Sequence, residues 1–535
     1  MSAISSTGDT RRHDLDALRA LAMLLGIVLH AIMTFVPGLW PIQDNTATPA
    51  MGALVLLIHG FRMPLFFLVS GFFTALLWRR YGLSGVIRHR LLRILLPCVL
   101  GTLTIVPLYR QIVKAAAKSP SRVAPTKSAP PKTVVEAAVQ GDSAALKRLL
   151  AAGGNVNTPD KQFGATPLSW AALRGDVAVA ELLLKNGAEV NRLNTGGSTA
   201  LHSAVLLGQD DVVTVLLKHG ANVTIRTRDD YTPGQLAYIG TATTQRLVTL
   251  LGLPPHSQRD IDAGRERCRK LLPPTTPRKI PLLDSLRQSY GEFLKAQCFS
   301  TPIFEHLWFL WFLCWLLPFF ALWTRISSRV RIPQKWVVSP LRYAWVIPLT
   351  VLPQLFMGTL MPAFGADTAM GLVPPPHLLF YYGVFFFFGA LYYEAGDTEG
   401  ILGRRWWLTL SLALAVFLPL GIVTLGMPAQ MTASTQVSYT WFMICGCLGL
   451  ARRFLAKESP TLRYLSDSSY WLYIAHLPLI VALQLLLRDL ALPLVVKLLV
   501  ILGVTVVALL ASYQLFVRHT LLGVLLNGKR APMRV

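Results

Sequence analysis

The sequence predicts an all-α, polytopic membrane protein of about ten transmembrane helices, with a soluble α-solenoid inserted after the third. Of its 535 residues, 53% are hydrophobic and only 15% are charged, which is too apolar for a soluble protein of this length. Many apolar runs approach the roughly 20 residues that cross a bilayer as a helix. These runs are continuous rather than alternating, which argues against a β-barrel.

The apolar runs define candidate spans whose edges are good to a few residues. They are 17–37, 53–78, 91–110, 304–323, 341–360, 377–394, 406–425, 437–455, 468–487 and 493–517. Lys and Arg follow every second span, whereas the loops 38–52, 361–376 and 426–436 contain neither. Because Lys and Arg accumulate on the cytoplasmic side, both termini are expected there, with 521–535 as a cytoplasmic tail. The same topology accounts for much of the net charge of +24, so we expect no nucleic-acid partner.

An internal repeat lies between spans three and four. The segment starting at Gly164 (Gly-Ala-Thr-Pro-Leu) returns at Gly197 and, in degenerate form, at Asp230, with a shift of 33 residues each time. This period, with Thr-Pro-Leu, Leu-Leu-Leu and Gly-Ala-x-Val-Asn elements, is typical of ankyrin repeats. The resemblance assigns 134–252 to an ankyrin solenoid, a stack of paired antiparallel helices.

Two linkers flank the predicted repeats: a Lys/Pro/Ala/Ser-rich segment, 111–133, and a Pro-rich basic segment, 253–303. Span three should end on the outer side, so the repeats are expected in the periplasm; long loops cross the membrane largely regardless of charge. The alternative is that one of the first three spans does not cross. Outside the cytoplasm Cys268 and Cys298 could form a disulfide, which spacing alone does not establish.

The first two spans carry ionisable residues where a plain anchor would have none. Arg19 and His30 are eleven residues apart, so they share one helix face about 16 Å apart along the axis. His59 and Arg62 are three apart on the next span and also share a face. Ionisable side chains at membrane depth are costly and usually functional, so these residues predict a polar site inside the bundle.

Six motifs in order carry a resemblance to a known family. They are Leu15-Asp16-Ala-Leu-Arg19 with His30, His59-Gly-Phe-Arg62-Met, Phe66-Phe67-Leu-Val-Ser70-Gly71-Phe72, Arg90-Leu-Leu-Arg93 before Pro97, His306-Leu-Trp308, and Tyr473-Ile-Ala-His476-Leu-Pro478. Together they resemble the acyltransferase 3 superfamily of membrane O-acyltransferases, closest to its glucans biosynthesis protein C branch. The resemblance assigns 12–110 and 304–520 to the acyltransferase domain, with the ankyrin repeats as an insertion.

The resemblance implies an enzyme of the bacterial inner membrane. It would move a succinyl or acetyl group from a cytoplasmic acyl-coenzyme A donor to a carbohydrate hydroxyl, with a periplasmic glucan as the favoured acceptor and no metal. The implied catalytic residues are His30, Arg19, Asp16, His59 and Arg62, the donor-binding residues are Arg90 and Arg93, and the acceptor-side residues are Glu305, His306, Trp308 and His476. A neutral imidazole suits the role of base because it titrates near physiological pH.

Plainer interpretations of these residues stay open. They are a hydrogen-bonded buried side chain for His30 and His476, an ion pair with Asp14 or Asp16 for Arg19, and a structural pairing for His59 and Arg62. Arg90 and Arg93 could be a topological anchor, Glu305 and His306 an interfacial cap, and Trp308 simple packing. Ser70-Gly71 indicates a tight helix contact rather than a nucleophile. The alternative functions are a transporter or flippase for an acyl or lipid-linked group, and a membrane-anchored scaffold whose ankyrin repeats bind a protein partner.

Overall fold

The computed structural model is entirely helical over the residues that it describes, with no strand among them. These are residues 12–527 apart from 49, 119–129, 161–162, 229, 239–243, 245–247, 249–252, 254–257, 276–285, 287–288, 291–301, 328, 330–331, 358–364 and 425–428. The chain forms two compact units: Met1–Arg122 together with Tyr290–Val535, and Val123–Ser289.

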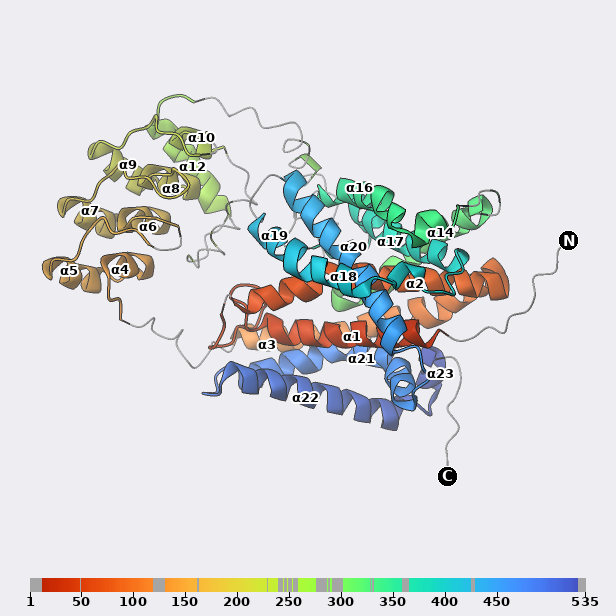
Figure 1. The fold of residues 1–535 in the computed structure, drawn as a ribbon. Coiled ribbons are helices and arrows are strands. Elements are labelled where there is room, and N and C mark those ends of the chain that lie inside the picture. The colour runs from red at the N-terminus through yellow and green to blue at the C-terminus, as the bar shows by residue number, and fades with distance from the viewer. Residues whose placement is uncertain are drawn as a thin grey trace. The chain divides into compact units, whose positions relative to one another are not determined.

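The first unit is the apolar helical bundle (Figure 1). Its helices are α1 (His13–Met33), α2 (Met51–Arg90), η1 (Leu91–Leu95), α3 (Leu96–Lys118), η2 (Glu305–Leu307), α14 (Trp308–Ser327), α15 (Lys335–Val338), η3 (Pro340–Arg342), α16 (Tyr343–Gln354), α17 (Pro376–Glu394), η4 (Ile401–Gly403), α18 (Trp406–Leu412), η5 (Ala413–Phe417), α19 (Leu418–Val423), α20 (Ala429–Phe454), α21 (Pro460–Leu487), α22 (Leu494–Ser512), η6 (Tyr513–Val517) and α23 (Leu521–Asn527). Helix α1 packs along α21 and against α2, and α2 packs along α17.

Among the described residues, six helical stretches are long and apolar enough to cross a membrane by length and composition. One of them, Met51–Lys118, contains both the second and the third predicted span, and its helix breaks at Gly82, where φ is 68°. The predicted class of polytopic α-helical membrane protein is confirmed, whereas the number of ten spans stays a prediction. Residues 111–118, expected in a linker, continue α3, and 521–527, expected in the tail, form α23.

Helices α2 and α17 approach each other through paired glycines. A Cβ atom placed on Gly71 would lie 1.8 Å from the carbonyl oxygen of Phe386, and one on Gly389 would lie 1.9 Å from the carbonyl oxygen of Leu68. Such backbone contact is possible only without a side chain, as in membrane helix pairs generally. The predicted tight contact at Ser70-Gly71 is therefore present, and it fixes the helix that carries His59 and Arg62.

We expect Gly71→Ala to destabilise the bundle, because the new methyl group has no space and the two helices must separate. Overpacking of this kind costs about 1–3 kcal/mol. The matched control is Gly383→Ala on α17, where the new Cβ would meet Leu316 at an ordinary 3.8 Å. The measurement is the thermal midpoint of the detergent-solubilised protein, and equal midpoints for the two variants would contradict the close contact.

Pro64 lies inside α2 and cannot donate to the carbonyl of Gly60, four residues earlier. The hydroxyl of Thr440 on α20 donates to this oxygen at 2.7 Å instead. The neighbouring carbonyl of Leu57 accepts a hydrogen bond of 2.7 Å from the hydroxyl of Tyr439. Helix α20 thus holds the turn of α2 from which His59 and Arg62 project.

The second unit is the repeat solenoid. Its helices are α4 (Val134–Gln140), α5 (Ser143–Ala151), α6 (Pro167–Arg174), α7 (Val177–Lys185), α8 (Ala200–Leu207), α9 (Asp210–Lys218), α10 (Pro233–Leu236) and α12 (Gln258–Leu271). The glycines that follow α7 and α9, Gly187 and Gly220, have φ of 86° and 80°, as the repeat pattern predicts. Buried Ala and Leu residues of successive helices form one continuous core.

Helix α12 lies within 253–303, which the sequence analysis assigned to a linker, and it packs against α8 and α9. The glycine pair Gly208 and Gly264 permits this backbone approach. Arg265 donates hydrogen bonds of 3.0 and 2.6 Å to the carbonyl of Leu206 near the end of α8. The sequence analysis read the many charged residues of this segment as a solvated linker. In the structure some of its arginines, such as Arg265, bind the repeats instead.

Cys268 of α12 is fully buried in the repeat core, and burial raises the pKa of its thiol to about 12. It is a free thiol. The other half of the possible disulfide, Cys298, lies outside the described residues.

His202 caps the start of helix α8 in the ankyrin unit. Its Nδ1 accepts from the backbone N–H of Thr199 at 3.1 Å, and its Nε2 donates to the carbonyl of Tyr231 at 3.1 Å. Burial lowers the pKa of this imidazole. Protonation therefore favours the unfolded chain, so the contribution of His202 to stability is complete above the unfolded pKa of about 6.5 and is lost as the pH falls through the lower folded pKa.

We expect His202→Gln to reduce this loss of stability below about pH 6.5. The substitution is matched by the chain itself, since Gln235 caps the next repeat from the equivalent position. The measurement is the urea midpoint of the fragment 123–289 between pH 7.5 and 5. Identical pH dependence in the two proteins would exclude His202 as the acid-sensitive group.

Candidate active site

Four helices bring the predicted histidines and one arginine together in the bundle. The His476 ring of α21 lies between those of His30 on α1 and His306 of η2, with ring centroids 5.3 and 5.1 Å away. His30 also interacts electrostatically with Arg62 and His59 of α2. The structure therefore unites His30, His59, Arg62, His306 and His476, which we call the histidine cluster.

Pro478 determines how His306 is held. Because proline has no N–H, the carbonyl of Ile474 four residues earlier lacks its helical donor. His306 Nε2 lies 3.0 Å from this oxygen. A carbonyl only accepts, so Nε2 carries the hydrogen and the buried Nδ1 presents a lone pair, for which the described residues provide no partner.

His476 is held in the opposite sense. Its Nδ1 lies 2.7 Å from the carbonyl of Tyr473 and 3.1 Å from that of Leu472, so Nδ1 carries the hydrogen. The lone pair is on Nε2, which is buried and has no partner among the described residues. The side chain is only 2% exposed. The hydroxyl of Tyr473 donates to the carbonyl of His306, which joins the two elements at this point.

Arg62 is a buried cation within the histidine cluster. Its side chain is 7% exposed, and no carboxylate forms an ion pair with it in the part of the chain that the structure describes. It packs on α1, where Gly26 leaves room: a Cβ there would lie 2.6 Å from Arg62 Nη1. Arg62 Nε has no hydrogen-bond partner among the described residues, and Tyr473 and Tyr382 interact with its charge. A buried unpaired cation is costly, and an anionic ligand would offset that cost.

His30 is positioned from behind. Gln484 of α21 donates to the carbonyl of His30 at 2.9 Å and accepts at 2.8 Å from the indole N–H of Trp40. The Trp40 ring lies 5.5 Å from the His30 ring between centroids. The buried Nδ1 of His30 has no partner in the described structure, so it is free to meet a ligand.

A buried ion pair fixes the loop that carries Trp40. Lys497 near the start of α22 donates to both carboxylate oxygens of Asp44 at 2.9 and 3.0 Å, to Asn45 Oδ1 at 2.7 Å and to the carbonyl of Arg488 at 3.2 Å. The Lys497 side chain is completely buried. The α1–α2 loop is thereby fastened to the α21–α22 turn, beside the histidine cluster.

Arg19 does not join the histidine cluster. It pairs with Asp16 at 3.6 Å and donates to the hydroxyl of Ser466 on α21 at 3.1 Å. The plainer interpretation of an ion pair with Asp16 is thus what the structure contains. Ser466 precedes His476 by ten residues, so Arg19 lies about 15 Å from the cluster along the paired helices.

Arg19 belongs instead to a separate cluster of basic residues. His89 of α2 interacts electrostatically with Arg19, and its Nε2 lies 3.4 Å from Arg93 Nη1. Arg93 lies in the π-helical turn η1, and the hydroxyl of Tyr470 donates to its carbonyl at 2.7 Å. We call Arg19, His89 and Arg93 the basic cluster.

Three other predicted residues have partners of their own, although Arg90 also interacts electrostatically with His89 of the basic cluster. Arg90 is buried and donates to the hydroxyl of Thr74. Glu305 accepts from Arg110 of α3 at 3.1 Å. Trp308 packs its ring 5.4 Å from that of Tyr382, as its packing interpretation expects.

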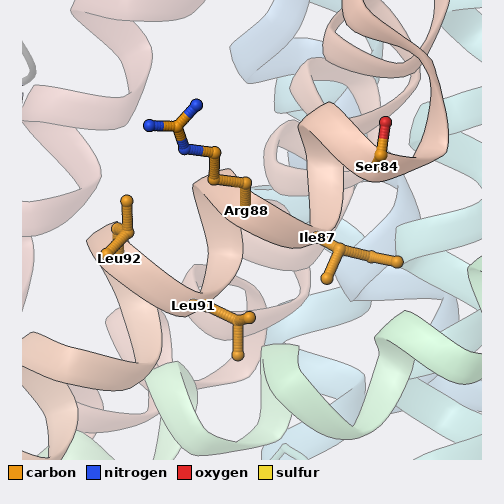
Figure 2. Close-up of a pocket in the computed structure, with 5 residues that line it drawn as sticks. All are labelled: Ser84, Ile87, Arg88, Leu91 and Leu92. Carbon is orange, nitrogen blue, oxygen red and sulfur yellow. The ribbon is translucent and has the colours of Figure 1, made fainter.

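A hollow of about 430 Å³ lies elsewhere on the bundle (Figure 2). It is lined by Ser84, Ile87, Arg88, Leu91 and Leu92, which all belong to the continuous stretch from α2 to η1. None of these residues belongs to either cluster. In Figure 2 Arg88 extends away from Ile87 and Leu91, so the hollow does not gather polar groups.

The sequence analysis missed the residues that support His30. A lysine within a predicted span, Lys497, was a visible signal because an unpaired cation there is costly. Its partner Asp44 lies in a loop that drew attention only for its lack of Lys and Arg. Trp40 and Gln484 gave no signal, because their contact depends on how the loop folds back.

The histidine cluster is suited to proton transfer from a hydroxyl. It combines two imidazole lone pairs with fixed direction, two further imidazoles and a guanidinium in a buried site. A neutral imidazole can accept the proton of an attacking hydroxyl. A guanidinium stabilises negative charge that develops at an acyl centre or binds an anionic group. In the described residues, no three His, Cys, Asp or Glu side chains are arranged to hold a metal ion.

Comparison with known proteins agrees with this arrangement. An acyltransferase domain model matches residues 12–122 and 271–517, and an ankyrin-repeat model matches 134–227 in three copies. The chain is 36% identical over 107 residues to glucans biosynthesis protein C of Salmonella paratyphi B, Salmonella heidelberg and Salmonella agona. Each alignment covers 20% of this chain and 26% of the relative, so the chain matches about a quarter of the length of these curated relatives.

The domain match extends over more than half of the chain and includes both clusters. Its two parts flank the repeat unit, as the motifs predicted. The chain therefore belongs to the acyltransferase 3 family of membrane acyltransferases and carries ankyrin repeats as an insertion in its acyltransferase domain.

Proposed function

We propose that this acyltransferase moves an acyl group from a cytoplasmic acyl-coenzyme A to a hydroxyl of a periplasmic glucan at the bacterial inner membrane. The observation that supports it most is the histidine cluster, in which unpartnered imidazole nitrogens share a buried site with the Arg62 guanidinium. In this mechanism His30 takes the proton of the attacking hydroxyl, whose oxygen forms a bond to the thioester carbon. The carbon–sulfur bond breaks, and coenzyme A leaves as a thiol after taking up a proton.

The basic cluster is our candidate for donor binding. Arg19, His89 and Arg93 bring two guanidinium groups and an imidazole together, and arginine matches the geometry of phosphate groups such as those of coenzyme A. His89 Nδ1 has no partner among the described residues. The roughly 15 Å along α1 that separates this cluster from His30 corresponds to the extended reach of the coenzyme's thiol-bearing arm. Arg90, already engaged by Thr74, is the weaker candidate of the predicted pair.

The charge on Arg62 favours a succinyl over an acetyl group. A succinyl group ends in a carboxylate, which would pair with the uncompensated guanidinium, whereas an acetyl group leaves the charge unpaired. Arg62→Gln should therefore lower the transfer of succinyl much more than that of acetyl. Equal losses for the two donors would indicate that Arg62 acts on the thioester carbonyl, which both share.

The experiment that tests the proposed function is mass spectrometry of cell-envelope glucans from cells with and without the gene. We expect ester-linked acyl groups only when the protein is present. By composition, each succinyl group adds ~100 Da and each acetyl group ~42 Da. A deletion strain with an unchanged glucan ester content would contradict the proposal. A transporter of acyl groups would also change the glucan ester content. The enzyme is distinguished from a transporter by the release of free coenzyme A from acyl-coenzyme A by the purified protein.

We also propose that the ankyrin repeats lie in the periplasm and bind a protein partner there. The support is the odd number of predicted spans before them and the usual role of such repeats. Protease added to intact spheroplasts should then cleave the repeats without cleaving a cytoplasmic control protein. Cleavage only after lysis would place the repeats in the cytoplasm.

A further inference from the structure

Two buried imidazoles in the histidine cluster have their hydrogens fixed by backbone carbonyls of α21. His306 gives its Nε2 hydrogen to Ile474, and His476 gives its Nδ1 hydrogen to Leu472 and Tyr473. The opposite nitrogens, His306 Nδ1 and His476 Nε2, are buried and have no partner in the described structure. Each of these two nitrogens can only accept a hydrogen bond.

The protein therefore leaves two adjacent acceptors unmet in one buried place, and the rings are 5.1 Å apart between centroids. Buried polar atoms are costly when they stay unpaired, so a ligand that fits must bring hydrogen-bond donors. Arg62, which interacts electrostatically with His476, carries a positive charge that repels an ammonium donor. The donors that suit this site are uncharged hydroxyl groups.

We infer that His306 and His476 form an acceptor-only pair that binds neighbouring hydroxyl groups of a neutral polyol, through His306 Nδ1 and His476 Nε2. This inference rests on the proposed function and deepens it, because it assigns the recognition of the acyl acceptor to two named atoms. His306 and His476 are positioning residues in this account: they hold the hydroxyls while His30, 5.3 Å from His476 between ring centroids, stays available as base.

The opposed hydrogen positions allow a crossed substitution test. A Gln side chain reaches the place of Nε2 and an Asn side chain the place of Nδ1. His476→Gln and His306→Asn therefore keep an acceptor oxygen facing the ligand. His476→Asn and His306→Gln instead keep only the hydrogen bond to the backbone carbonyl. A purely structural role predicts the reverse order, because it depends on the backbone bond alone.

The measurement is binding of a neutral glucose oligomer to the full-length detergent-purified protein, by calorimetry and without acyl donor. We expect His476→Asn and His306→Gln to weaken binding about tenfold, the equivalent of one lost hydrogen bond, and the two acceptor-keeping variants to bind nearly as wild type. The reverse order, or equal binding by the two variants at each position, would overturn the inference.

A second arm uses only the wild-type protein and so does not depend on how the variants fold. A fully O-methylated glucose oligomer has no hydroxyl group to donate and should not bind. The inference would be overturned if it bound as tightly as the unmethylated oligomer, or if the unmethylated oligomer did not bind. The binding assay contains no acyl donor, so it tests the hydroxyl-binding pair separately from the proposed acyl transfer. If the oligomer binds but no acyl group is transferred, the proposed function is contradicted and the inference about hydroxyl binding is not.

Discussion

Replacing His30 by alanine should lower the rate of acyl transfer by about 10²–10⁴-fold, the usual contribution of a positioned general base. The protein holds the His30 backbone through Gln484 and packs its ring against Trp40, so loss of the imidazole removes a base and not a structural bond. The Nδ1 of His30 has no partner among the described residues, and alanine therefore leaves no protein group unpaired. Turnover should fall while the amount of folded protein stays the same.

His13→Ala is the matched control, because His13 begins the same helix and lies outside the histidine cluster. Both variants are measured for initial rate in membranes with equal amounts of protein, judged by immunoblot. Retained transfer by His30→Ala with normal expression would remove His30 from catalysis. The base would then have to be sought among the other imidazoles of the cluster.

Replacing Lys497 by methionine should destabilise the bundle by about 3–5 kcal/mol, because it leaves a buried charge without its partner. Asp44 would keep its hydrogen bonds from the backbone and side chain of Thr46 but would lose the ammonium group at 2.9 Å. The α1–α2 loop would loosen, and with it the contact between Trp40 and His30. We expect a lower thermal midpoint of the purified protein together with a lower rate of acyl transfer.

The double variant Lys497→Met with Asp44→Asn separates charge from packing. Asparagine keeps an oxygen for Thr46 and carries no charge, so the double variant should recover most of the stability that the single variant lost. If Lys497→Met alone unfolds at the wild-type temperature, the ion pair does not stabilise the loop. If the double variant is no more stable than the single one, the loss comes from packing and not from the unpaired charge.

Much of the fold could be predicted because the chemistry is local or periodic. Apolar run length indicates membrane helices, and a 33-residue period indicates the repeat, as Gly187 and Gly220 confirm with their positive φ. Helix α12 could not be found this way. Its sequence is dominated by charge, and its fit depends on Gly208 of a distant helix.

The candidate site was predictable in part for the same reason. Ionisable residues within apolar spans mark His30, His59 and Arg62, whatever the packing, because lipid would penalise them. Arg19 is also an ionisable residue at the start of an apolar span. It lies three helical turns from His30, however, and pairs there with Asp16. Which nitrogen of His306 carries the hydrogen depends on Pro478 in a helix far along the chain, and no pattern in the sequence reveals this contact.

The most direct test of the account is simultaneous measurement of both products with the purified full-length protein in lipid vesicles, supplied with succinyl-coenzyme A and a glucose oligomer. We predict that free coenzyme A and ester-linked succinyl appear in equal amounts, and that Arg62→Gln and His30→Ala reduce both together. Coenzyme A and ester formation that are undiminished in both variants would contradict the claim that the histidine cluster is where acyl transfer occurs.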